Sequence, residues 1–297
     1  MKKRALPYNS GFMMVCAACG MLAALALAAP QFTDAQVGGR GRFRGGGMRG
    51  GIGEGRPGPE EIGAYSPLMA DLEQMKARGL FPTGLRPVYP EKAECPAVTS
   101  PFGSQRRGDG SWRNERFYNG YHGGLDIPAP EGTPILAIAG GTVIRKKEGR
   151  GIGGVGIMLQ HSPEDTGLPA WTYTEYKHLR EMPKIPIGQR VRMGEVIAYA
   201  GNTGTKGGHY GVLGFSHLHL TAFFSPGSKF WARRIFVPIG GQWMDPLALF
   251  KGGTLQSAKI RDLPDDKKWV KFAYKTTDGK LAPDGSKVVW PFACKPR

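Results

Sequence analysis

The chain has 297 residues, of which 40% are hydrophobic, so it can bury a sizeable core and cannot be disordered throughout. Its 46 glycines and 24 prolines favour a turn-rich, mainly β protein. The formal net charge of +16 predicts attraction to anionic polymers, which is a statement about attraction and not about chemistry.

The first 29 residues have the pattern of an export signal. Met1–Arg4 are basic, Gly11–Ala29 are uncharged and mostly apolar, and Ala26–Ala28 supply the small residues that a signal peptidase reads. We therefore expect residues 1–29 to be a signal peptide; the alternative is an uncleaved anchor that attaches the protein to the membrane. Either way, the rest of the chain is exported, to the periplasm, the cell envelope or the medium.

Residues 30–60 are expected to form a flexible linker. Their glycine-rich part, Val37–Pro59, cannot form a packed core. Five arginines and one glutamate between Val37 and Arg56 make it basic, so we expect it to bind anionic envelope polymers. Arg-Gly repeats also occur in RNA-binding tails, but export, shortness and a single aromatic residue, Phe43, argue against nucleic acid as a partner.

Residues 61–94 are expected to form a helical lead-in segment. Ser66 is a suitable N-cap, Pro67 suits the first helical position, and Gly79 suits the C-terminal stop. Apolar residues recur between them at helical spacing, namely Leu68, Leu72 and Met75. The pattern predicts one short amphipathic helix that docks on the domain after it.

Residues 95–250 change to short β-type runs with glycine turns. Six strands are predicted: Thr133–Ile138, Thr142–Lys146, Val155–His161, Trp171–Lys177, Glu195–Ala200 and His217–Phe224. Gly140-Gly141, between the first two, is typical of a tight hairpin turn. Residues 251–297 form a β-rich C-terminal extension, with strands predicted at Trp269–Thr276 and Ser286–Trp290.

The cysteines indicate one cross-link. Cys16 and Cys19 lie in the predicted signal, so the mature chain keeps Cys95 and Cys294, one on either side of the main domain. Because export places both in an oxidising compartment, we expect a disulfide that closes a long loop. The alternative is a pair of unrelated buried thiols.

Three segments concentrate histidine and carboxylate side chains. His122 and Asp126 lie four residues apart, and the two glycines between them disfavour a helix and let the backbone bend both side chains toward one point. His217 and His219 alternate with leucines on a predicted strand, so they share one face. His178 ends another predicted strand.

This set is typical of a catalytic zinc site, which takes three ligands from His, Asp and Glu and keeps a fourth position for water. His122, Asp126 and one member of the His217/His219 pair supply the ligands, and the other two histidines remain for proton transfer. The chain has no His-Glu-x-x-His segment, which excludes the common helical zinc-protease arrangement.

The motifs, in this order over residues 97–224, resemble the lysostaphin-type (LytM-like) zinc endopeptidases. The segments that carry the resemblance are Val98–Gly103, His122 with Asp126, Ala129–Ala137, Gly154–Ile157, His161, Tyr176–Leu179, Val191–Ile197, Gly201–Gly204 and His217–His219. The resemblance implies a compact antiparallel β fold of the duplicated-hybrid-motif type, with a groove across one sheet.

The resemblance also implies the roles of the site residues. His122, Asp126 and His219 would bind one Zn²⁺ per chain, and His178 and His217 would be the catalytic histidines. Members of the family hydrolyse stem or cross-link peptides of peptidoglycan. We therefore expect an exported zinc endopeptidase that acts on the bacterial cell wall.

The sequence departs from the family pattern in two places. Thr205–Ser216 is longer than usual, which affects substrate specificity, and Thr221 stands where the family often has glutamate. The two remaining histidines are expected to have ordinary roles, His161 as a structural hydrogen-bonding group and His209 as a solvated side chain.

Three other functions compete with the endopeptidase. A metal-free relative could bind the wall and activate a separate amidase, but such relatives lose site residues and this chain keeps all five. A phosphocarrier domain belongs to the cytoplasm, which conflicts with the export signal. A simple binder of anionic polymers would use the Arg-Gly segment and need no metal, so bound zinc separates it from the enzyme.

Overall fold

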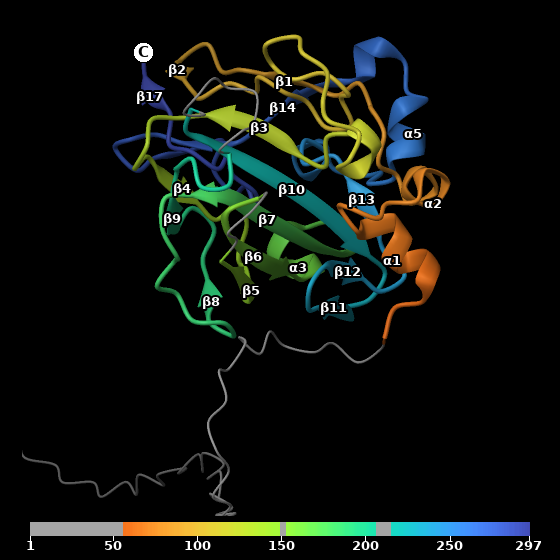
Figure 1. The fold of residues 1–297 in the computed structure, drawn as a ribbon. Helices are drawn as coiled ribbons and strands as arrows, with labels where there is room; N and C mark the ends of the chain where they lie inside the picture. The colour runs from red at the N-terminus through yellow and green to blue at the C-terminus, as the bar shows by residue number, and fades with distance from the viewer. Residues whose placement is uncertain (1–55, 149–152, 206–214) are drawn as a thin grey trace, which may run out of the picture. The chain divides into compact units, whose positions relative to one another are not determined.

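A seven-stranded antiparallel sheet lies at the centre of the chain (Figure 1). The computed structural model describes residues 56–148, 153–205 and 215–297. The strand order is β13-β10-β7-β6-β5-β8, and β3 pairs with β10 on the edge opposite β7, beyond the end of β13. The strands of this sheet are β3 (Leu125–Pro128), β5 (Gly141–Lys147), β6 (Val155–His161), β7 (Trp171–Leu179), β8 (Arg190–Val191), β10 (His217–Ser225) and β13 (Gln242–Met244).

Short two-stranded sheets and short helices surround the central sheet. The paired strands are β1 (Arg86–Val88) with β14 (Trp269–Lys271), β2 (Ala93–Glu94) with β17 (Lys295–Pro296), β4 (Pro134–Leu136) with β9 (Val196–Tyr199), β11 (Phe230–Ala232) with β12 (Phe236–Pro238), and β15 (Tyr274–Lys275) with β16 (Leu281–Ala282). The helices are α1 (Pro59–Tyr65), α2 (Leu72–Ala77), α3 (Pro163–Thr166), α4 (Ala248–Lys251) and α5 (Ser257–Arg261), with 3-10 turns η1 (Tyr118–Gly120) and η2 (Asp265–Lys267). This architecture confirms the mainly β, antiparallel fold. Among the described residues, no helix is long and apolar enough to cross a bilayer.

All six strands predicted between residues 133 and 224 are present, as β4, β5, β6, β7, β9 and β10. The hairpin predicted at Gly140-Gly141 is wrong, because β4 pairs with β9 and β5 pairs with β6 and β8. Gly141 instead allows a close approach between neighbouring segments. A Cβ atom there would lie 2.6 Å from His161 Nδ1 and 2.7 Å from Gln160 O, so no side chain fits.

The lead-in segment contains two short helices where the sequence predicted one. Ser66 ends α1 in an extended conformation, as expected of a residue before proline, so its prediction as an N-cap is wrong. Asp71 caps α2 through its carboxylate, and Gly79 (φ +94°) follows the end of α2 as the predicted stop. The segment docks on the sheet, since the Tyr65 ring stacks on Trp243 at 5.7 Å.

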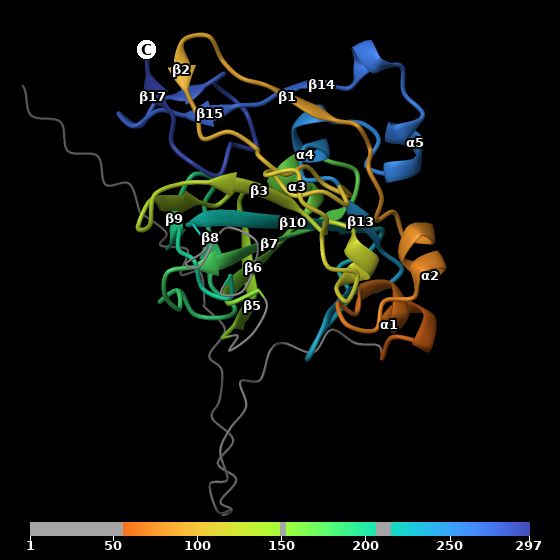
Figure 2. The same cartoon turned by 45° about the horizontal axis from the view of Figure 1, so that its top comes forward.

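The C-terminal extension packs beside the N-terminal part of the described chain. The disulfide between Cys95 and Cys294 is present, which confirms the predicted cross-link, and β17 pairs with β2 next to it (Figure 2). The strand predicted at Ser286–Trp290 is absent, because successive amides bond to different segments. Val289 N–H donates to Ile138 O and Trp290 N–H donates to Ala273 O, so no continuous ladder forms.

Candidate metal centre

The pairing of β3 with β10 brings the predicted ligands together. The two strands lie side by side in both views (Figures 1 and 2), and their register places Asp126 directly opposite His219. Opposed residues of an antiparallel pair project on the same face. His122 reaches the same point from the loop before β3, where Gly124 lets the backbone pass close to Leu220 O, 2.4 Å from where a Cβ would stand.

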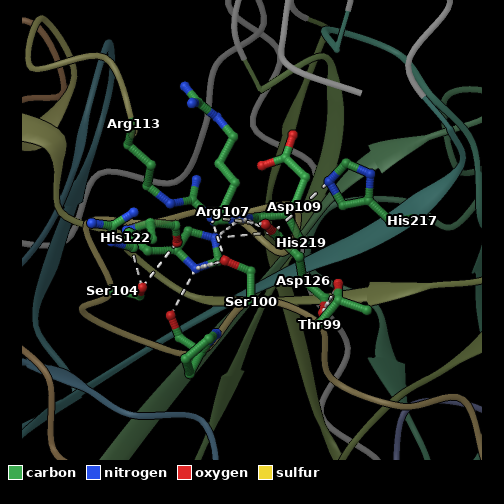
Figure 3. Close-up of polar contacts among 12 residues, drawn as sticks. Thr99, Ser100, Ser104, Arg107, Asp109, Arg113, His122, Asp126, His217 and His219 are labelled. Carbon is green, nitrogen blue, oxygen red and sulfur yellow. Dashed lines mark hydrogen bonds and ion pairs between the residues drawn. The ribbon is translucent and has the colours of Figure 1, made fainter. Parts of the chain in front are cut away.

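Three donor atoms converge at this point (Figure 3). Asp126 Oδ1 lies 3.0 Å from His122 Nε2 and 2.8 Å from His219 Nδ1, and the two nitrogens are 3.1 Å apart. Ligands of a tetrahedral Zn²⁺ at 2.0–2.1 Å are separated by about 3.3 Å. Two imidazoles and one carboxylate at these separations fit a zinc ion after a small outward movement.

The charge states of the three side chains suit a metal ion. Burial lowers the pKa of His122, and it lowers the pKa of His219 well below the usual value, so both imidazoles are neutral at pH 7. Burial raises the pKa of Asp126, but the adjacent His122 and His219 outweigh it and hold that pKa well below its usual range. Neutral imidazoles and an ionised carboxylate are the forms that bind metal.

Hydrogen bonds to neighbouring groups orient each of these side chains. The His122 Nδ1–H donates to Pro101 O at 2.9 Å, which leaves Nε2 toward the site. The His219 Nε2–H has Thr221 Oγ1 as its acceptor at 3.1 Å, which leaves Nδ1 toward the site. Thr221, the departure from the family pattern, therefore orients the predicted ligand His219 through its hydroxyl.

Arg113 also contacts Asp126, and the sequence did not predict this contact. Its Nη2 donates to Asp126 Oδ2 at 3.0 Å and to Ser100 Oγ at 2.6 Å, so only Oδ1 of the carboxylate faces His122 and His219 (Figure 3). The residue lies in a loop that carries an isolated β-bridge between Arg106 and Trp112. No spacing or periodicity in the sequence indicates where such a loop folds back.

His178 and His217 lie beside the three convergent side chains. The ring centroid of His178 is 4.6 Å from that of His217 and 5.8 Å from that of His219. His178 Nδ1–H donates to Thr203 O at 2.8 Å, which leaves its Nε2 as an acceptor. His217 Nδ1–H donates to Phe215 O at 3.1 Å, and its Nε2 lies 3.8 Å from Asp126 Oδ1. Burial, with His217 nearby, lowers the pKa of His178 to about 3.

A bulge in β7 turns His178 toward this face. Val155 pairs with Leu179 and Gly156 pairs with Lys177, so His178 is the extra residue, and its φ of +62° is left-handed. With strict alternation, the side chain of His178 would lie on the face opposite that of Lys177, in the core. The bulge turns the ring toward His217 and His219 instead.

The other two histidines lie apart from this group or outside the described residues. His161 is fully buried; its Nδ1 bonds to Gly140 O at 2.6 Å and its Nε2 to Thr174 Oγ1 at 2.8 Å. Burial lowers the pKa of His161 to about 4. These contacts confirm a structural role. His209 and most of the Thr205–Ser216 segment lie outside the described residues.

Comparisons with known proteins match the same region. Residues 120–223 match the model of peptidase family M23. An uncharacterized metalloprotease of Haemophilus influenzae is 35% identical over 131 residues, which cover 44% of this chain and 23% of the relative. The DD-carboxypeptidase/endopeptidase Mpg of Neisseria meningitidis serogroup B is 32% identical over 126 residues, 42% of this chain and 24% of the relative. The match thus spans about a quarter of each curated relative.

Two solved structures are also similar to this chain. LytU is 26% identical, with 49% of this chain and 83% of that chain covered and a TM-score of 0.33. The catalytic domain of lysostaphin from Staphylococcus simulans is 26% identical, with 35% and 68% covered and a TM-score of 0.29. The family match contains His122, Asp126, His178, His217 and His219 and confirms the resemblance drawn from the motifs. Over residues 120–223, the chain is therefore similar to peptidase family M23.

Proposed function

We propose that this protein is a zinc-dependent endopeptidase that hydrolyses peptide bonds in bacterial cell-wall peptidoglycan. The observation that carries the proposal is the convergence of His122, Asp126 and His219 on one point, with His178 and His217 beside it. The relative from Neisseria meningitidis is named an endopeptidase, and the one from Haemophilus influenzae a metalloprotease.

In this proposal His122 Nε2, Asp126 Oδ1 and His219 Nδ1 hold one Zn²⁺. When bound, zinc supplies Lewis-acid chemistry, because it polarises a carbonyl and lowers the pKa of a water to about 7. The ordering of the ligands by Pro101 O and Thr221 Oγ1 means that little reorganisation is needed to receive the ion.

The catalytic work of the chain falls to His178 and His217. The Nδ1–H of each ring donates to a backbone carbonyl, and the Nε2 of His217 lies 3.8 Å from Asp126 Oδ1, beside the proposed ligands. One Nε2 can accept a proton from the attacking water and deliver it to the leaving amine. The other, once protonated, can donate a hydrogen bond to the oxygen of the scissile carbonyl as negative charge develops on it.

Around this site we propose the organisation expected from the sequence. Residues 1–29 export the chain, residues 30–60 hold it near anionic envelope polymers, and residues 95–250 form the peptidase domain. Residues 61–94 and 251–297 support that domain by packing, as the Tyr65–Trp243 stack and the Cys95–Cys294 disulfide illustrate.

The alternative is an exported, non-catalytic relative that binds the wall and activates a separate amidase. The sequence of a Pseudomonas aeruginosa protein named a lipoprotein NlpD/LppB homolog is 35% identical over 82 residues, and that name states no catalytic activity. The five intact side chains favour the enzyme.

Two measurements on the purified chain test the proposal. Metal analysis should find about one zinc per chain. Incubation with isolated peptidoglycan, followed by mass analysis, should find new amino and carboxyl termini within the peptides. A zinc-loaded chain that releases no termini but stimulates a separate amidase would support the alternative.

A further inference from the structure

Basic side chains continue across the sheet from the metal centre. Lys177 on β7 lies directly opposite His219, Gly156 on β6 lies opposite Lys177, and Lys147 on β5 lies opposite Gly156. Opposed residues project on one face. His219, Lys177 and Lys147 therefore form one row on the face that carries the predicted ligands, and Gly156 contributes no side chain between the lysines.

The neighbouring row on the same face contains Glu175 and Arg145, and Glu175 balances part of the positive charge of the lysines. Glu175 on β7 and Arg145 on β5 flank Met158. Glu175 Oε2 lies 2.7 Å from Lys177 Nζ, and Glu175 Oε1 lies 3.7 Å from Arg145 Nη1. Arg145 Nη2 also donates to the carbonyls of Arg233 and Arg234, each at 3.1 Å. One carboxylate is thus shared between two cations.

Lys147 is left without such a partner. Among the described residues, its ammonium makes no hydrogen bond or ion pair. It lies beside Lys177, since a Cβ built on Gly153 would be 3.8 Å from Lys147 Nζ and 3.9 Å from Lys177 Cδ. Burial lowers the pKa of Lys147, Glu175 opposes that shift, and Lys177 and Arg145 reinforce it. Glu175 is thus ion-paired with Lys177 and Arg145 but not with Lys147, and the excess positive charge of the three side chains is one that an anion would relieve.

We propose that Lys147 and Lys177, supported by Arg145, form a subsite for a carboxylate of the peptide substrate, either an acidic side chain or a free terminal carboxyl group. The proposal rests on the proposed function, which places the scissile bond at the metal centre. Neighbouring strands are about 4.8 Å apart, so the backbones of Lys177 and Lys147 lie roughly 5 and 14 Å from that of His219. An extended peptide advances about 3.4 Å per residue, so the carboxylate belongs about one to four residues from the scissile bond.

The test uses two peptides that differ only in a carboxylate or its amide within that distance of the cleaved bond. For the zinc-loaded protein we expect kcat/KM to be about 5- to 20-fold higher for the acid, the range of a partly desolvated charge-assisted contact. Lys147→Met should reduce this preference to about 2-fold or less by raising KM for the acid alone, and Lys147→Arg should retain most of it. Equal cleavage of acid and amide by the unmodified protein would overturn the subsite.

Lys146→Met is the matched control. Lys146 is the neighbouring residue of β5, but its ammonium donates to Pro183 O at 3.1 Å and not to the Lys147 group. The substitution removes the same charge from the same strand, so a loss of acid preference here would show that general electrostatic attraction, and not the subsite, is responsible.

A binding measurement separates this inference from the proposed function. Calorimetric titration of the two peptides into the zinc-free protein should show tighter binding of the acid, and Lys147→Met should abolish that difference. Selective binding without cleavage by the zinc-loaded protein would refute the peptidase and keep the subsite. Cleavage of both peptides, with no selectivity in rate or affinity, would keep the peptidase and refute the subsite.

Discussion

Thr221→Val tests how the structure supports the metal centre. The substitution replaces the hydroxyl by a methyl group of similar size, and it removes the acceptor that lies 3.1 Å from His219 Nε2. Thr221 is only 1% exposed, so water cannot readily take the place of the hydroxyl. The tautomer and orientation of His219 are then no longer fixed, and the free ring must reorganise before its Nδ1 can bind a metal.

Loss of such a supporting contact lowers metal affinity by about 10- to 100-fold, or about 1.4–2.8 kcal/mol. The assay is zinc competition against a chelator of known affinity, with the thermal unfolding of the zinc-free proteins measured in parallel. Thr172→Val is the matched control, because Thr172 is a fully buried threonine on the neighbouring strand whose hydroxyl makes no hydrogen bond among the described residues. A zinc affinity of Thr221→Val within twofold of the unmodified protein would refute the reasoning.

Four further predictions concern the site histidines, the disulfide, His161 and the basic linker. His219→Ala should lose zinc and activity together, whereas His217→Ala should keep zinc and lose activity by about 10²- to 10⁴-fold. Metal analysis and peptide turnover measure both effects. Loss of zinc from His217→Ala but not from His219→Ala would exchange the two roles. Reduction of the disulfide should lower the free energy of unfolding by about 4–5 kcal/mol in urea titrations, and two reactive thiols in the unreduced mature chain would contradict the bridge. The pKa of His161 is about 4 in the folded protein and 6.5 in an unperturbed imidazole, so the unfolded chain binds the proton more readily. The free energy of unfolding should therefore fall by up to about 3 kcal/mol as the pH falls from 6.5 to 4. If the pH dependence of that free energy is the same in His161→Asn, the prediction is contradicted. Deleting residues 37–55, which contain four arginines, should weaken salt-sensitive binding to isolated cell walls, while turnover of a small soluble peptide should not change.

Local periodicity was sufficient to predict the strands and one face of the site. His217 and His219 alternate with Leu218 and Leu220, and the structure buries both leucines completely while the histidines project toward Asp126. Such a pattern depends only on the two-residue repeat of a strand and on which face is apolar, both of which are local properties.

Pairing between distant strands could not be predicted in the same way. The glycines at 140 and 141 had the composition of a hairpin turn, yet β4 pairs with β9, about sixty residues further along the chain. Glycine is needed at position 141 because His161 approaches it closely, and this contact appears only after folding. Arg113 is a similar case, because its contact with Asp126 depends on the path of a loop and on no repeat in the sequence.

His178 shows why a functional position can depend on a break in periodicity. A histidine that continued the alternation of β7 would lie among the buried side chains of Thr174 and Tyr176, away from His217. The structure turns it by a bulge and a left-handed φ of +62°, a conformation that costs a non-glycine residue about 1–2 kcal/mol. The bond from Nδ1 to Thr203 O and the contact with the His217 ring hold the residue there. Local strain of this kind persists where surrounding contacts over-determine it, and it is concentrated at functional sites, which supports the proposal that His178 takes part in the chemistry.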